Sequence, residues 1–262
     1  MFIIGELING MYKQVGRAIA EKDKKVIQDL AKRQVEAGAR ALDVNCGPLS
    51  KNPLSDMQWL VETIQEVVDV SLSLDSTKPD VIEAGLKLVK QKAVINSTSA
   101  DQEKLDKLLP MANKYKTYLI GLSLDKKGVP QDKDRRIELA ATIAAAAQDA
   151  SFPVEDLLLD PVVLPVNVAQ AQGINVIEAI REFKLLTSPA PKVIVGLSNV
   201  SQGTCERNLI NRIFLVMAIG AGLDSAILDP LDKELMNSLI AAELILNKQI
   251  YCDSFLDAYR KK

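Results

Sequence analysis

The chain has 262 residues, of which 48% are hydrophobic and 25% are charged, and its formal net charge is −2. These values are typical of a folded globular protein with a large apolar core. Because acidic and basic residues are mixed along the chain, a nucleic-acid partner is disfavoured. The chain contains no histidine, which excludes within it a Ser-His-Asp triad, a histidine general acid and a histidine-ligated metal.

Membrane and disulfide signals are weak. The longest apolar stretch, residues 213–223, is shorter than the ~20 residues that a membrane-spanning helix needs. Cys46, Cys205 and Cys252 are odd in number and far apart, a pattern typical of neither a disulfide framework nor a Cys-x-x-Cys metal site. We therefore expect a cytoplasmic protein without membrane contact, in which the cysteines are small buried side chains.

Eight short apolar stretches recur along the chain and predict β-strands. They are residues 2–4, 41–45, 71–75, 93–96, 117–122, 157–160, 193–199 and 225–229. Turn residues and stretches with helical spacing lie between them, such as Val26, Ile27, Leu30 and Ala31. Strand and helix thus alternate, and about 250 residues is the usual length of an eight-stranded barrel. We predict that residues 1–262 form a single α/β domain, an eight-stranded parallel (β/α)8 TIM barrel.

Most of these stretches end in a carboxylate or an amide. An open doubly wound sheet would gather such groups near one switch point, whereas here almost every strand carries one. In a barrel, Asp75, Asn96 and Asp160 would project into the same mouth, where they would suit a flat heterocycle with several N–H groups. The alternative is that Asp75 and Asp160 are helix N-caps, because the residues after them form ordinary cap or turn sequences.

These motifs together resemble the pterin-binding barrel family. The similarity is carried by residues 41–45, 74–77, 95–98, 159–161 and 195–201, and it extends from residues 4–10 to residues 251–255. The family includes dihydropteroate synthase, the folate module of cobalamin-dependent methionine synthase, and methyltetrahydrofolate:corrinoid/iron–sulfur protein methyltransferase. The chain is most similar to the last of these.

The resemblance implies a folate site and assigns its residues one by one. For folate binding it implies Asp75, Asn96, Asp160, Gly196, Ser198, Asn199, Gln202 and Arg207. Asp75, Asn96 and Asp160 would hydrogen-bond the pterin ring, and Asn199 would lie near the methyl-bearing ring nitrogen, so that Asn199 and Asp160 are the expected catalytic residues. Arg207 would hold the benzoyl-glutamate tail, the alternative being a surface arginine that opens the next helix. Asp43 and Asn45 are expected to support these residues rather than to touch folate.

Differences within the family narrow the expected activity. Dihydropteroate synthases resemble one another in a Ser-Arg-Lys-type segment that holds pyrophosphate, whereas here residues 198–200 carry no charge. Methionine synthase needs a zinc-bound thiolate, and the cysteines of this chain do not cluster. The resemblance therefore implies a methyltransferase that moves the methyl group of methyltetrahydrofolate to cobalt(I) of a corrinoid carried by a partner, the corrinoid/iron–sulfur protein. It also implies a homodimer that binds no metal itself. The alternatives are a synthase-like pterin enzyme and a non-catalytic folate-binding barrel.

Overall fold

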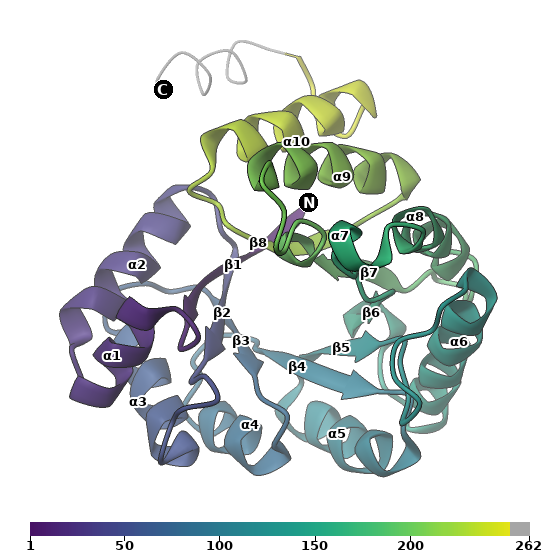
Figure 1. Cartoon of the computed structure of the whole chain (residues 1–262). Coiled ribbons are helices and arrows are strands. Elements are labelled where there is room, and N and C mark those ends of the chain that lie inside the picture. The colour runs from purple at the N-terminus through teal and green to yellow at the C-terminus, as the bar shows by residue number, and fades with distance from the viewer. Residues whose placement is uncertain (252–262) are drawn as a thin grey trace.

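Eight parallel strands close into a barrel in the computed structural model, which describes residues 1–251 (Figure 1). Each strand pairs with the next along the chain, and β8 pairs with β1. The strands are β1 (Phe2–Asn9), β2 (Ala41–Asn45), β3 (Ser71–Asp75), β4 (Val94–Ser99), β5 (Tyr118–Leu122), β6 (Leu157–Asp160), β7 (Lys192–Gly196) and β8 (Ser225–Leu228). The predicted (β/α)8 architecture is therefore confirmed.

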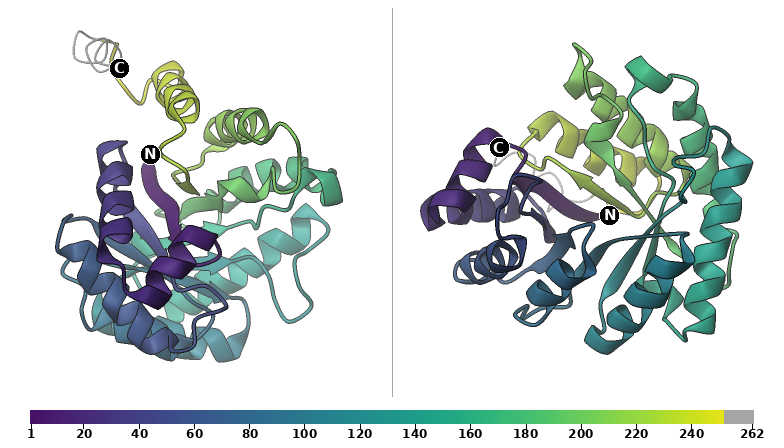
Figure 2. Two further views of the ribbon diagram at one scale, coloured as in Figure 1. Left: turned by 60° about the vertical axis from the view of Figure 1, so that its left-hand side comes forward. Right: turned by 60° about the horizontal axis from the view of Figure 1, so that its bottom comes forward.

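Helices surround the strand ring on all sides (Figures 1 and 2). They are α1 (Lys13–Glu21), α2 (Lys24–Glu36), α3 (Pro53–Gln65), α4 (Pro79–Leu86), α5 (Gln102–Tyr115), α6 (Lys133–Asp149), α7 (Val166–Ala169), α8 (Gln172–Phe183), α9 (Arg207–Ala221) and α10 (Lys233–Ile245). Two short 3-10 segments, η1 (Val154–Asp156) and η2 (Leu197–Asn199), precede β6 and follow β7. The predicted helical spacing after residue 26 is confirmed by α2, which buries Ile27 and Ala31.

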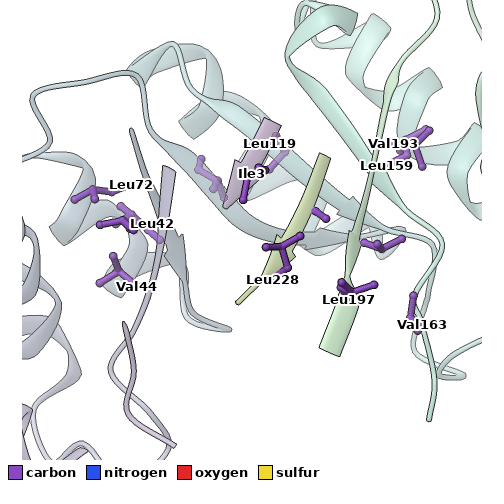
Figure 3. Packing of buried hydrophobic residues seen from close by; sticks show 14 of the residues in the cluster. Ile3, Leu42, Val44, Leu72, Leu119, Leu159, Val163, Val193, Leu197 and Leu228 are labelled. Carbon is purple, nitrogen blue, oxygen red and sulfur yellow. The ribbon is translucent and has the colours of Figure 1, made fainter. Parts of the chain in front are cut away.

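Two apolar layers hold the barrel together. The alternation of side chains along each strand sends one set inward and the other outward. The inner layer is small and consists of Ile4, Ala41, Val94, Ile120, Leu158 and Ile194. The larger outer layer includes Ile3, Leu42, Leu72, Leu119 and Leu159, which pack with the surrounding helices (Figure 3). On β1, β2, β4 and β6 the positions that continue the inward set toward the carboxyl ends are Glu6, Asp43, Asn96 and Asp160, and they belong to the rim described below, whereas Leu122 of β5 remains apolar.

Several strand boundaries differ from those predicted. The bounds of β2, β3 and β6 agree with the prediction, but β1 continues to Asn9 instead of stopping at residue 4. β7 ends at Gly196, and residues 197–199 form η2, in which Val200 N–H bonds back to the Leu197 carbonyl. Asn199 therefore lies in a turn and not in a strand. The prediction placed the strand end too late because the apolar pattern continues through Leu197. Such a pattern does not reveal that a local i to i+3 hydrogen bond forms there.

β1 is longer because it contains a bulge. Gly5 pairs with Leu42 and Ile8 pairs with Val44, so that two residues of β1, Glu6 and Leu7, lie opposite one residue of β2. The Leu7 N–H donates to Gln34 Oε1 of α2 at 3.0 Å, and Gln34 is fully buried. A buried side chain thus satisfies a backbone group that the bulge removes from the ladder.

Remaining sequence predictions have mixed outcomes. Cys46 is buried as expected, but Cys205 is exposed, which contradicts the prediction, and Cys252 lies outside the described residues. The end of the resemblance, residues 252–255, also lies outside them. Among helices of the described part of the chain, none combines the length and apolar character required to cross a membrane.

Gly5→Ala should destabilise the protein, because a Cβ at this position would lie 2.4 Å from Gln34 Oε1. The displaced Gln34 would leave the Leu7 N–H buried and unsatisfied, a loss of about 1–3 kcal/mol in the free energy of unfolding. Gly173→Ala in α8 is the matched control, since no atom lies within 4 Å of its Cβ position, and it should be neutral or stabilising by up to about 1 kcal/mol. Urea denaturation of both variants measures the difference, and equal midpoints would contradict this account of the bulge.

Candidate functional site

Polar side chains of β2, β3 and β4 form one hydrogen-bonded group at the carboxyl end of the barrel. Asn45 Nδ2 donates to Asp75 Oδ2 at 2.6 Å, and Asn96 Nδ2 donates to Asp43 Oδ1 at 3.0 Å. Asp43 Oδ1 also accepts the Ser73 hydroxyl at 2.7 Å. Asp75 and Asn96 are direct neighbours in the strand register. Asp43 is buried, whereas Asp75 and Asn96 are only half-buried, so that Asp43 supports Asn96 from beneath.

A second group lies across the ends of β6 and β7. Asp160 is buried and accepts the Val162 N–H on Oδ1 at 2.7 Å, and the backbone N–H of Gly196 also bonds to this carboxyl. The Asn199 side chain folds over Gly196, where an added Cβ would lie 3.0 Å from Asn199 Nδ2. Gly196 therefore permits the approach of Asn199 to the strand end, and it links Asn199 to Asp160.

The loop that follows Asp160 depends on a buried arginine that sequence reasoning missed. Val162 has φ of 62°, a left-handed conformation that is unusual for a β-branched residue. Arg136 of α6 is fully buried, and its Nε donates to the Pro161 carbonyl at 2.9 Å while Nη1 donates to the Asp132 carbonyl at 3.1 Å. Burial lowers the pKa of this guanidinium. Arg136 thus holds the backbone that presents the Val162 N–H to Asp160.

Gln202 and Arg207 are exposed residues beyond the turn that contains Asn199. The Gln202 N–H donates to the Asn199 carbonyl at 3.2 Å. Arg207 is the first residue of α9, and its Nε and Nη2 lie 3.3 Å and 3.4 Å from Ser201 Oγ and the Ser198 carbonyl oxygen. Both residues therefore belong to the wall of the rim next to η2.

A cavity of about 680 Å³ opens at the same rim, on the side of β1 and β8. Its lining includes Glu6, Ser198, Arg207 and Asp229. Glu6 Oε1 accepts the Ser198 hydroxyl at 2.6 Å. Sequence reasoning missed Glu6 because it ended the first strand at residue 4. The sequence signal that could have revealed Glu6 is the alternation of side chains along the strand. Ile4 points inward, and Glu6, two residues later, continues on the same side.

The rim carboxyls share one electrostatic property. Burial raises the pKa of Asp43 to about 8, and the nearby charges of Asp75 and Glu6 raise it further. The hydrogen bonds from Ser73 and Asn96 act in the opposite direction and lower it. Burial likewise raises the pKa of Asp160 to about 7, of Glu6 to about 7, and of Asp75 above its usual value. Carboxyls of this kind change protonation near neutral pH and can either accept or donate a hydrogen bond.

This arrangement favours recognition of a polar heterocycle. The two groups supply acceptors and amides from opposite parts of one ring of strands. Within residues 1–251, no set of three or more histidine, cysteine, aspartate or glutamate side chains is placed to hold a metal ion. The chemistry that the site residues themselves supply is hydrogen bonding and proton exchange.

Asp43→Asn should make the protein more stable at high pH. The folded-state pKa of Asp43, about 8, lies above its usual 3.8, so that its contribution to stability is present below pH ~4 and is lost as the pH rises toward 8. An asparagine Oδ1 keeps the acceptor for Ser73 and Asn96 and cannot ionise. Thermal unfolding should show a higher Tm for the variant than for the wild type at pH 8.5, with the gap shrinking toward pH 4. If the difference in Tm between the variant and the wild type stayed constant from pH 4 to pH 8.5, the idea that ionisation of buried Asp43 destabilises the fold would be contradicted.

The chain is similar in sequence to known proteins over most or all of its length. Residues 13–229 match the family described as pterin binding enzyme. The chain is 31% identical to the methylcorrinoid:tetrahydrofolate methyltransferase of Eubacterium limosum, over 100% of this chain and 97% of the relative. It is also 29% identical to the methionine synthase of Mycobacterium leprae over 87% of this chain. The matched region spans only 20% of that longer protein.

Solved structures show the same fold. A Yersinia pestis DHPS in complex with a pterine-sulfa conjugate has a TM-score of 0.68 and 18% identity, with 94% of each chain covered. A Coxiella burnetii dihydropteroate synthase in complex with pteroic acid has a TM-score of 0.67 and 15% identity, with 93% of this chain and 92% of that chain covered. The match over residues 13–229 and the 31% identity to a relative that is covered over 97% of its length show that the chain belongs to the pterin binding enzyme family.

Proposed function

We propose that this protein is a folate-dependent methyltransferase that moves a methyl group between methyltetrahydrofolate and the cobalt of a corrinoid, with a corrinoid/iron–sulfur protein as the partner that carries the corrinoid. The proposal is supported by the relative from Eubacterium limosum, of which 97% is matched by the whole of this chain. The observation that carries it is the uncharged turn after β7, which holds the Asn199 amide beside Gly196, the residue whose N–H bonds to Asp160.

The rim residues account for recognition of the pterin. Asp75 and Asn96, adjacent in the strand register, bind one edge of the ring, and Asp160 binds from the other side of the mouth. The raised pKa values of Asp75 and Asp160 allow each carboxyl to match a ring N–H or a ring acceptor by losing or keeping its proton. Ser198, Gln202 and Arg207 contact the rest of the folate, with Arg207 placed for a carboxylate of its tail.

Methyl transfer requires a good leaving group. In transfer to the corrinoid, cobalt(I) supplies the electron pair of the new bond, while the pair of the broken C–N bond stays on the pterin nitrogen. That nitrogen must gain a proton or a strong hydrogen bond by the transition state. Asn199 donates a hydrogen bond but cannot ionise, so it stabilises the nitrogen while the proton comes through Asp160 and solvent.

The reaction is a reversible displacement. The same residues would therefore serve transfer in either direction. The name of the Eubacterium limosum relative puts the corrinoid on the donor side for that protein. The solved dihydropteroate synthases share the fold, but a leaving pyrophosphate needs cations, and the turn Leu197–Asn199 has none.

Asn199→Ala should slow single-turnover methyl transfer by about 100- to 1,000-fold, the usual cost of removing a donor aimed at developing charge. The assay mixes protein, methyltetrahydrofolate and reduced cobalamin and follows methylcobalamin in the visible spectrum, while calorimetry checks that folate still binds. Wild-type protein that binds folate but forms no methylcobalamin would identify a non-catalytic folate-binding barrel and contradict the proposed function. An unimpaired Asn199→Ala variant would contradict the role of this amide.

Asp160→Asn should weaken folate binding by about 10-fold or more, because an amide donor then faces a ring N–H that needs an acceptor. Asp149→Asn, an exposed change at the end of α6, is the control and should bind as the wild type does. Calorimetric titration with methyltetrahydrofolate gives both dissociation constants. Equal affinities in the two variants would remove Asp160 from the ring contacts.

We also propose a homodimer formed through α9 and α10, which lie side by side on the outside of the barrel (Figure 1). α9 is apolar on two faces: it buries Phe214, Leu215 and Ala218 toward the barrel, and it exposes a stripe at helical spacing. The exposed stripe consists of Leu209, Ile213, Val216 and Met217, which are 39–54% exposed. A continuous apolar stripe on a single helix face suits a second copy of the same helix.

The paired change Ile213→Glu and Met217→Glu should convert this dimer into a monomer, because it places charge in the centre of the stripe. Leu185→Glu changes an isolated residue that is 77% exposed and should leave the assembly intact. Sedimentation at micromolar concentration measures the mass of all three proteins. A wild-type protein that sediments as a monomer would rule out the dimer.

A further inference from the structure

Glu6 is a rim carboxyl that neither the predicted site nor the proposed reaction uses. It lies within the bulge of β1, continues the inward alternation after Ile4, and is largely shielded from solvent. Its Oε1 accepts the Ser198 hydroxyl at 2.6 Å across 192 residues of sequence. Burying a carboxyl is costly, and an apolar residue would pack the same place more favourably. The cost points to a task for this side chain.

Three features of the chain hold Glu6 in place. The bulge gives β1 the additional residue, and bulges near active sites commonly redirect one side chain. Gln34 of α2 satisfies the Leu7 N–H next to Glu6 at 3.0 Å. Gly5 leaves the space that Gln34 occupies, since a Cβ there would lie 2.4 Å from Gln34 Oε1. The position of Glu6 is therefore fixed by the strand and by the helix behind it.

The partner of Glu6 is the residue that precedes Asn199. Ser198 is held from two sides, because its hydroxyl bonds to Glu6 of β1 while its carbonyl oxygen lies 3.4 Å from both Ser201 Oγ and Arg207 Nη2. With both ends of Ser198 fixed, the direction in which the chain enters Asn199 is fixed as well. The Asn199 carbonyl in turn accepts the Gln202 N–H.

Glu6 also connects the two halves of the site. Its charge acts on Asp43, which holds Asn96 through a hydrogen bond of 3.0 Å. On its other side Glu6 contacts the turn of Asn199 through Ser198. Because β1 pairs with β2 on one side and with β8 on the other, Glu6 lies between the group on β2 to β4 and the group on β6 and β7.

We propose that Glu6 is a positioning residue that acts through Ser198 to set the place of the Asn199 amide at the mouth of the barrel. This inference rests on the proposed function, because Asn199 is the group that meets the methyl-bearing nitrogen. In this role Glu6 acts on the reacting nitrogen only through its bond to Ser198. Loss of its bond should therefore lower the rate of methyl transfer more than it lowers folate affinity.

The experiment measures single-turnover methyl transfer and folate dissociation constants for Glu6→Leu, Glu6→Gln, Ser198→Ala and the double variant Glu6→Leu with Ser198→Ala. Glu6→Leu should reduce the rate about 10- to 100-fold, the usual effect of a small misplacement, and should change affinity by less than about threefold. Glu6→Gln should recover most of the loss, since its amide oxygen accepts the same hydroxyl. The double variant should be no slower than the slower single variant, because both changes break one link.

A pH profile separates positioning from a merely structural role. The groups that face Glu6 are Ser198 of η2, Arg207 of α9, Asp43 of β2, Asp229 after β8 and Tyr12 after β1. Burial places the pKa of Glu6 at about 7, and the ionised carboxylate is the stronger acceptor for Ser198. As the pH falls below 7, the wild-type rate should therefore decline toward the rate of Glu6→Gln, whose own profile lacks this step.

The outcomes distinguish this inference from the proposed function. An inactive wild-type protein would overturn both. An active wild type with an equally active Glu6→Leu variant, or with losses that multiply in the double variant, would overturn the role of Glu6 alone. If Glu6→Leu does not fold, the variants Glu6→Gln and Ser198→Ala still test the positioning role of Glu6. That role would be contradicted by equal pH profiles in the wild type and Glu6→Gln together with a full rate in Ser198→Ala.

Discussion

The burial of acidic side chains at one end of the barrel is the constraint on which the rest of the structure depends. Parallel strands deliver their carboxyl ends to a single rim, and Glu6, Asp43, Asp75 and Asp160 meet there with pKa values raised chiefly by burial. Such groups reduce stability, and proteins commonly retain this cost where a site needs it. The cost is offset by the two apolar layers of the barrel, one within the strand ring and one beneath the helices.

The helices do more than cover the strands, because two of them send buried polar side chains to the backbone near the rim. Gln34 of α2 supports the bulge that places Glu6, and Arg136 of α6 holds the loop whose Val162 N–H meets Asp160. Each is a polar residue with no measurable exposure. Specific hydrogen bonds of this kind define a single backbone arrangement where apolar packing alone would permit several.

Much of the fold and part of the site could be predicted from sequence. β2, β3 and β6 were found at their bounds because apolar runs end there in Asn45, Asp75 and Asp160, and parallel topology then brings these residues to one rim. Glu6, Arg136 and the turn Leu197–Asn199 could not be predicted. A bulge depends on pairing with another strand, the burial of Arg136 depends on distant packing, and a 3-10 turn leaves an apolar pattern unbroken. The exposed Cys205 likewise shows that residue type alone does not fix burial.

A crystal structure with bound methyltetrahydrofolate tests the central claim most directly. The account predicts that the pterin ring lies in the mouth between Asp75 and Asn96 on one side and Asp160 on the other, with the Asn199 amide next to the methyl-bearing nitrogen. A pterin ring bound in the cavity between Glu6 and Asp229, or outside the mouth altogether, would contradict it.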